Sequence, residues 1–124
     1  MNQPGRVLIV DDDPAIRRVL ELALASEAFE VRQAGDGREG LAILDSWRPD
    51  LILLDLMMPV MDGWAFRDRQ RETASLADIP VIVLSASCNL RGEQTAAIQP
   101  AAALPKPFDL DRLLETVGQV ISRN

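Results

Sequence analysis

Asp55 is the first residue whose type and position could do chemistry, because it interrupts a long apolar run. Residues 51–54 read Leu-Ile-Leu-Leu before it, and Pro59 and Gly63 mark a loop after it. Four aliphatic residues in a row are typical of a strand that is buried on both faces, as in a parallel sheet. A carboxylate among apolar neighbours is unfavourable unless another group pairs with it. On this stretch alone, a simple cap of the strand–loop turn is an equally good interpretation of Asp55.

A second group of carboxylates, Asp11, Asp12 and Asp13, follows the apolar residues 7–10 directly. Asp13 precedes Pro14, and this pair is typical of a helix N-cap followed by proline in the first turn. Capping leaves Asp11 and Asp12 without an assigned role. A solvated acidic turn is the alternative interpretation, since runs of charge usually lie on the surface.

Two further groups, a hydroxyl and an ammonium, lie near the ends of later apolar runs. Ser85 follows residues 81–84, and Lys106 lies between Pro105 and Pro107. Lys106 is the only lysine among 13 basic residues. A compact ammonium and a planar guanidinium do not replace each other at a tight site. Taken singly, each has an ordinary interpretation: a locally hydrogen-bonded serine, and a solvated lysine left by codon bias.

The elements that must position these groups alternate along the chain. Strand-like runs are predicted at residues 6–10, 29–33, 51–54, 81–84 and 101–104. Helices are predicted between and after them, the segment 88–99 being the weakest candidate and the charged stretch 67–72 a solvated helix face. The second strand alternates apolar and polar residues, which indicates a sheet edge. The pattern predicts an α/β fold with a doubly wound, five-stranded parallel sheet in the order 2-1-3-4-5.

This strand order would bring the candidate residues together. It creates a switch point between the first and third strands, where Asp11, Asp12 and Asp55 would converge. Converging carboxylates raise one another's pKa unless a cation is present, and an oxygen-only site of this kind suits Mg²⁺. With the Ser85 hydroxyl and the Lys106 ammonium nearby, the parts needed to accept a phosphoryl group are all present.

At these residues the chain resembles the receiver domain of bacterial two-component response regulators. The resemblance rests on four motifs in order, which are Val10–Pro14, Asp55–Gly63, Ser85–Ala86 and Lys106–Phe108. It implies a flavodoxin-like receiver fold and a single domain over residues 1–124. It also implies that Asp55 accepts a phosphoryl group from a histidine of a sensor kinase or phosphotransfer protein, with a downstream protein or effector domain receiving the signal.

The same resemblance implies roles for the other site residues. Asp12 would bind Mg²⁺ directly, Asp11 largely through water, and Met57 through its backbone carbonyl. The apolar Met57 side chain, two residues after the acceptor, would point towards the site. Ser85 and Lys106 would contact the phosphoryl oxygens, and the Lys106–Pro107 bond would be cis. The chain would catalyse only its own phosphorylation and dephosphorylation, so it would not be an enzyme in the usual sense.

Two positions depart from the family pattern. Receivers usually carry Tyr or Phe three residues before the lysine, where this chain has Ala103, and Pro100 replaces a more usual alanine. We therefore expect the signal to pass through the loop after Ser85 and the segment up to Gln99, instead of through a ring on the fifth strand.

Composition excludes several classes of protein. The net charge of −6 argues against general binding to nucleic acid or anionic membranes, and Asp55 interrupts the longest apolar run before it reaches the length of a membrane span. The amino-terminal residues 1–6 lack the apolar core of a signal peptide. Cys88 is the only cysteine and there is no histidine, which excludes an internal disulfide and a Cys/His zinc site. These features predict a cytosolic protein.

Two other functions stay open at this point. One is a Mg²⁺-dependent phosphatase with Asp55 as nucleophile. Haloacid-dehalogenase-type phosphatases carry a second acid two residues after the nucleophile, where this chain has Met57. The other is a binding module that keeps the fold and is never phosphorylated; acetyl phosphate would distinguish it.

Overall fold

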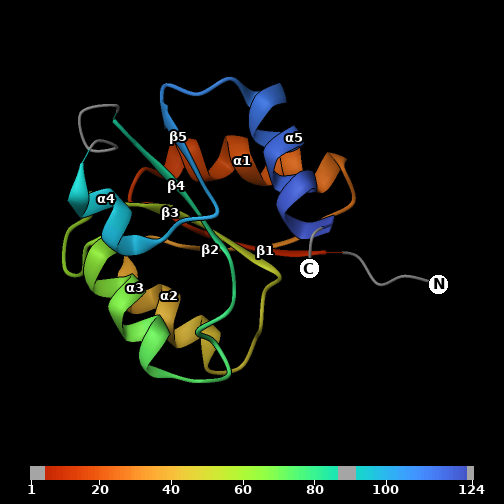
Figure 1. Ribbon diagram of the computed structural model, residues 1–124. Helices are drawn as coiled ribbons and strands as arrows, with labels where there is room; N and C mark the ends of the chain where they lie inside the picture. The colour runs from red at the N-terminus through yellow and green to blue at the C-terminus, as the bar shows by residue number, and fades with distance from the viewer. Residues whose placement is uncertain (1–4, 87–91, 123–124) are drawn as a thin grey trace.

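The computed structural model describes residues 5–86 and 92–122, which form one five-stranded sheet with helices on both faces (Figure 1). All neighbouring strands are parallel, in the order β2-β1-β3-β4-β5. The strands are β1 (Arg6–Val10), β2 (Glu30–Ala34), β3 (Leu51–Asp55), β4 (Val81–Ala86) and β5 (Ala102–Lys106). The predicted fold class and strand order are therefore confirmed.

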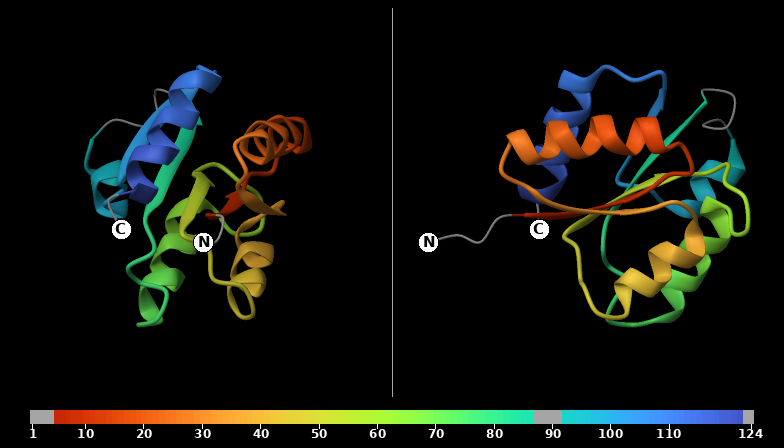
Figure 2. Two further views of the ribbon diagram at one scale, coloured as in Figure 1. Left: turned by 90° about the vertical axis from the view of Figure 1, so that its right-hand side faces the viewer. Right: turned by 180° about the vertical axis from the view of Figure 1, so that it is seen from behind.

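The helices divide between the two faces of the sheet, as the edge-on view in Figure 2 shows. They are α1 (Pro14–Ser26), α2 (Gly37–Leu44), α3 (Gly63–Glu72), α4 (Glu93–Ile98) and α5 (Leu110–Ser122). Helices α1 and α5 cover one face, and α2, α3 and α4 cover the other. This arrangement follows from right-handed crossovers between parallel strands.

Each face of the sheet has its own hydrophobic core. On β1, Val7 and Ile9 pack with α1 and α5, whereas Leu8 and Val10 pack with α2 and α3. The strands β1 and β3 are apolar on both faces because helices cover both. The edge strand β2 differs: it alternates exposed and half-buried positions up to the buried Ala34, in keeping with the alternation in its sequence.

Aspartate side chains cap the amino-terminal ends of most of the helices. Asp13 accepts hydrogen bonds from the amides of Ala15 and Ile16, which confirms its predicted capping role. Asp36 and Asp62 cap α2 and α3 in the same way. Asp109 accepts from the Arg112 amide at the start of α5. These caps fix where each strand–helix connection ends.

Some sequence-based expectations differ from the structure. The helical spacing of Val19 with Leu20 and Leu24 predicts that it faces the core, but Val19 is 49% exposed, whereas Leu20 and Leu24 are buried. Strands β4 and β5 extend further than predicted, so Ser85 and Lys106 lie within strands. Helix α4 is only six residues long. Ser87 and Cys88 lie outside the described residues.

The largest correction concerns the charged stretch 67–72, which we expected to be a solvated helix face. Arg67 and Gln70 are instead buried, at 7% and 0% exposure. Their side chains turn inward because they donate hydrogen bonds to backbone carbonyls of neighbouring segments. Composition alone does not separate a charge that faces water from one that satisfies buried carbonyls.

Candidate functional site

Three carboxylates converge at the carboxyl-terminal ends of β1 and β3. Asp55 is the last residue of β3, and Asp11 and Asp12 follow β1 directly. Each residue offers an oxygen that lies within 4.8 Å of the other two. Asp11 and Asp55 are buried, whereas Asp12 is exposed to solvent. The predicted convergence at the switch point is therefore present.

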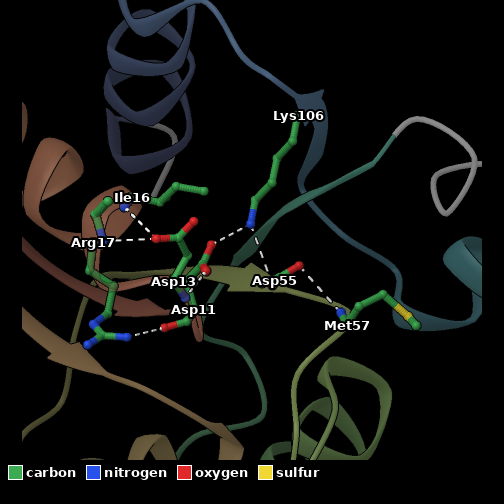
Figure 3. Close-up of polar contacts among 8 residues, drawn as sticks. Asp11, Asp13, Ile16, Arg17, Asp55, Met57 and Lys106 are labelled. Atoms are coloured by element: carbon green, nitrogen blue, oxygen red, sulfur yellow. Dashed lines mark hydrogen bonds and ion pairs between the residues drawn. The ribbon is translucent and has the colours of Figure 1, made fainter.

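Lys106, at the end of β5, points into this cluster (Figure 3). Its Nζ donates a hydrogen bond to Asp11 Oδ2 at 2.6 Å and lies 3.5 Å from Asp55 Oδ2. The side chain is 20% exposed, so the pairing takes place in a partly desolvated environment. The Lys106–Pro107 bond is cis, as expected from the sequence.

The environment shifts two pKa values at the site. Burial raises the pKa of the Asp55 carboxyl to about 6; Asp11 and Asp12 act in the same direction, and Lys106 and the Met57 amide oppose them. Burial also disfavours the charged form of Lys106, but its contacts with Asp11 and Asp55 outweigh that effect and raise its pKa. Three carboxylates face this one ammonium, so the site carries a net negative charge, which favours the binding of a divalent cation.

Backbone contacts hold the carboxylates in place. Asp11 Oδ1 accepts from the Asp13 amide at 2.8 Å, and Asp55 Oδ1 accepts from the Met57 amide at 3.4 Å. Behind Asp55, Gly63 begins α3 so close to the strand that a Cβ there would lie 2.6 Å from the Asp55 carbonyl oxygen. Only glycine allows this approach.

Arg17 on α1 is a supporting residue that the sequence did not identify. Its Nη1 donates to the Asp11 carbonyl oxygen at 2.6 Å (Figure 3). Its Nε donates to Gln33 Oε1 on β2 at 3.2 Å. Gln33 in turn donates to Glu21. The only available signal was the spacing of Arg17, one helical turn after Asp13, which places it above the end of β1.

The remaining predicted residues occupy two different environments. Ser85 is buried, 1% exposed, on β4, and β4 lies between β3 and β5. Met57 is 57% exposed, and its side chain extends away from the carboxylates (Figure 3). We had expected this side chain to point towards the site. Met57 belongs to neither hydrophobic core, and its side chain lies largely in solvent.

The donor set fits Mg²⁺. All three side chains offer carboxylate oxygens, the ligand type that this hard cation prefers, and the exposed position of Asp12 leaves room for water. The described residues at the site offer no thiolate or imidazole. A buried carboxylate next to an ammonium, in a cluster of carboxylates that could hold a cation, is suited to nucleophilic attack on a phosphoryl group.

Comparison with protein families gives the same assignment as the geometry. Residues 7–118 match the family model described as the response regulator receiver domain. The chain is 39% identical over 119 residues to the DNA-binding dual master transcriptional regulator RpaA of Synechocystis, which covers 95% of this chain and 49% of RpaA. It is also 39% identical over 122 residues to the response regulator MprA of Mycolicibacterium vanbaalenii, with 97% and 52% covered. The chain thus spans about half the length of these curated relatives.

Solved structures agree with these relatives. The chemotaxis response regulator CheY4 of Vibrio cholerae superimposes with a TM-score of 0.87 at 33% identity, covering 94% of this chain and 98% of CheY4. The signal receiver domain of a signal transduction histidine kinase from Syntrophus aciditrophicus gives 0.85 at 28% identity, with 95% and 90% covered. These neighbours therefore include domains from both regulators and kinases.

Proposed function

This chain belongs to the receiver domain family of response regulators, and from that premise we propose that Asp55 is its phosphoacceptor. The donor would be a phosphohistidine of a sensor kinase or phosphotransfer protein. The observation that carries the proposal is the placement of Asp55: a buried carboxylate at a strand end, 3.5 Å from Lys106 Nζ and grouped with Asp11 and Asp12.

The proposed reaction is an in-line transfer. A carboxylate oxygen of Asp55 attacks phosphorus, the P–N bond to the donor histidine breaks, and the imidazole leaves with the bonding electron pair. Asp55 must be ionised to attack, and its pKa of about 6 leaves it mostly ionised at neutral pH. Asp11, Asp12 and Asp55 would hold Mg²⁺, with the Met57 carbonyl as a further ligand. When bound, this cation would offset the negative charge on the phosphoryl oxygens.

Lys106 and Ser85 would contact the phosphoryl group once it is on Asp55. In the present structure the Lys106 ammonium pairs with Asp11 and Asp55. Phosphorylation converts the Asp55 carboxylate into an acyl phosphate, and we propose that the ammonium then contacts a phosphoryl oxygen. The Ser85 hydroxyl, on the strand between those of Asp55 and Lys106, would donate to another. The chain would thus catalyse its own phosphorylation and dephosphorylation without turning over a separate substrate.

The wider role is also proposed from the family. We infer that residues 1–124 form a single receiver domain acting in the cytoplasm, and that a downstream protein or an effector domain reads its state. Neither nucleic acid nor a membrane would be bound directly, in keeping with the net charge of −6. Within the described part of the chain, no helix is long and apolar enough to cross a bilayer.

Intact mass spectrometry after incubation with acetyl phosphate tests the proposal. We expect the gain of one phosphoryl group with Mg²⁺ and none with a chelator. Asp55→Asn should abolish the gain, and Asp68→Asn, an exposed change on α3, should leave it unchanged. A phosphoryl group on the Asp55→Asn variant would overturn the assignment. Continuous release of inorganic phosphate from phosphate esters would instead favour a phosphatase.

A further inference from the structure

Helix α3 carries a buried guanidinium that the proposed chemistry does not use. Arg67 is 7% exposed, and within residues 5–86 and 92–122 no carboxylate pairs with it. Burial, with a smaller contribution from Arg71, lowers the pKa of Arg67 to about 10, so the charge persists at neutral pH. A buried charge needs compensating hydrogen bonds.

Backbone carbonyls supply this compensation. Arg67 Nε donates to the Ile98 carbonyl at 2.9 Å, and its Nη2 to the Gln99 carbonyl at 3.4 Å. Its Nη1 donates to Gln70 Oε1 at 2.9 Å and to the Ile79 carbonyl at 3.3 Å. Gln70 then donates to the carbonyls of Leu76 and Ile79, at 2.9 and 3.1 Å. This network joins α3, the segment before β4 and the end of α4.

Arg71 adds a second guanidinium to the same helix end. It donates to the Ala97 carbonyl at 2.8 Å and also to the Ile98 carbonyl. The last carbonyls of a helix lack partners within the helix and form the negative end of its dipole. Two arginines on α3 therefore satisfy the carboxyl-terminal carbonyls of α4, whose last residues Figure 1 shows beside α3.

The two ends of α4 differ sharply. At the amino-terminal end the cap is Gly92, with φ 83° and no side-chain cap hydrogen bond. At the carboxyl-terminal end Gln99 adopts a left-handed conformation with φ 53°, followed by the Ala101 amide bonded to the Val81 carbonyl at 2.8 Å. A six-residue helix has little stability of its own, so its position depends on these end contacts.

We propose that Arg67, Gln70 and Arg71 form a clamp that fixes the carboxyl-terminal end of α4, so that phosphorylation-linked movement of α4 is confined to its amino-terminal end and pivots near Gln99. The clamp itself depends only on the contacts above; the pivot rests on the proposed function. The pivot would compensate for the missing ring at Ala103, because a tilt of α4 changes the surface beside β5 without a rotamer switch on that strand.

Amide exchange followed by NMR in the unphosphorylated protein tests the clamp. Arg67→Lys keeps the positive charge, but a single ammonium nitrogen cannot reach all the carbonyls that the guanidinium contacts. Arg71→Ala removes the hydrogen bonds to the Ala97 and Ile98 carbonyls. Arg71 is less buried than Arg67, so the protein is better able to tolerate this change. We expect exchange at residues 96–99 to speed up about tenfold or more in each, the effect of losing a charge-assisted hydrogen bond. Arg69→Ala, exposed on the same helix with only a 4.0 Å pair to Glu72, is the control and should exchange like wild type.

The pivot is tested with beryllofluoride, a phosphoryl mimic, on the wild-type protein. In the wild-type protein we expect beryllofluoride to change amide exchange at residues 92–95 and to leave it constant at 97–101. In Arg71→Ala we expect the change to spread through 97–101. Wild-type exchange at 96–99 in both clamp variants, or equal changes along all of α4 in the wild-type protein, overturns the proposal. If beryllofluoride changes nothing anywhere, the proposed function fails and the unphosphorylated variants alone decide the clamp.

Discussion

Asp55 combines burial with a negative charge, and at the scale of single residues this combination defines the site. One ammonium faces the three clustered carboxylates, and burial, with smaller contributions from Asp11 and Asp12, raises the Asp55 pKa to about 6. The resting protein is therefore less stable than it would be with a neutral group at this position. The same imbalance is what a divalent cation and a phosphoryl group would relieve.

The first prediction is that Asp55→Asn stabilises the protein in a pH-dependent way. The folded pKa of about 6 exceeds the ordinary value of 3.8, so the folded state holds more protons than the unfolded state between these values. Wild-type stability contributed by this group is therefore lost as the pH rises from about 4 to 6. In chelator, the variant should gain about 3 kcal/mol over wild type at pH 8 and almost nothing near pH 4.

Urea unfolding at the two pH values measures this difference, with Asp68→Asn as the control that should match wild type at both. An Asp55→Asn variant that is no more stable than wild type at pH 8 would show that burial does not oppose the Asp55 charge.

The second prediction is a long-lived phosphoryl group, because Met57 cannot orient an attacking water. Its side chain is 57% exposed and extends away from Asp55, and it ends in a thioether, a weak hydrogen-bond acceptor. Met57→Asn or Met57→Glu places a polar group there and should speed the loss of phosphate by about tenfold or more, within the range for positioning a reactant. Decay of the phosphorylated mass after removal of the donor measures the rate; unchanged or slower decay in both variants contradicts the prediction.

At the scale of elements, the β3–α3 connection depends on how closely the helix approaches the strand. A Cβ on Gly63 would lie 2.6 Å from the Asp55 carbonyl and 2.8 Å from Leu56 Cα, and neither backbone atom can yield without moving the acceptor. Gly118 on α5 provides the contrast, because nothing lies within 4 Å of a Cβ added there. A side chain is therefore excluded at Gly63, whereas there is space for one at Gly118.

The third prediction follows from this contrast. Gly63→Ala should lower the free energy of unfolding by about 1 to 3 kcal/mol through overpacking. It should also weaken Mg²⁺ binding, because the Asp55 backbone shifts. Gly118→Ala should raise the free energy of unfolding by about 0.5 to 1 kcal/mol, since alanine favours the helix. Thermal unfolding and Mg²⁺ titration of both variants check the pair; a stable Gly63→Ala protein with normal Mg²⁺ affinity would contradict it.

Element by element, the sequence predicts best where one physical cause dominates. The apolar runs ending in Asp11 and Asp55 predicted buried parallel strands, and Asp13 before Pro14 predicted a cap, because burial and capping leave clear local patterns. Arg67 was misassigned because its partners, the carbonyls of Ile79, Ile98 and Gln99, are distant in sequence or carry no side-chain signal. Its spacing with Gln70 and Arg71, three and four residues apart, was the available clue.

At the scale of the whole molecule, the parallel sheet is the reason a site exists at all. Asp11, Asp55, Ser85 and Lys106 come from positions spread over most of the chain, yet four parallel strands deliver them to one edge of the sheet. The convergence was predictable because right-handed crossovers and an edge-type second strand together favour the order 2-1-3-4-5. The pairing of Lys106 with Asp11 at 2.6 Å was not, since it depends on how far β5 extends.

The single lysine gives the molecule a chemical reporter of its own state. An amine-acylating reagent has only Lys106 and the α-amino group to modify, because every other basic side chain is a guanidinium. At rest the ammonium is held by Asp11 and is only 20% exposed, so acylation there is slow. Any event that frees this ammonium, or binds it more tightly, should change how fast it is acylated. A mass spectrum of residues 1–124 can therefore follow the occupancy of the site without an introduced probe.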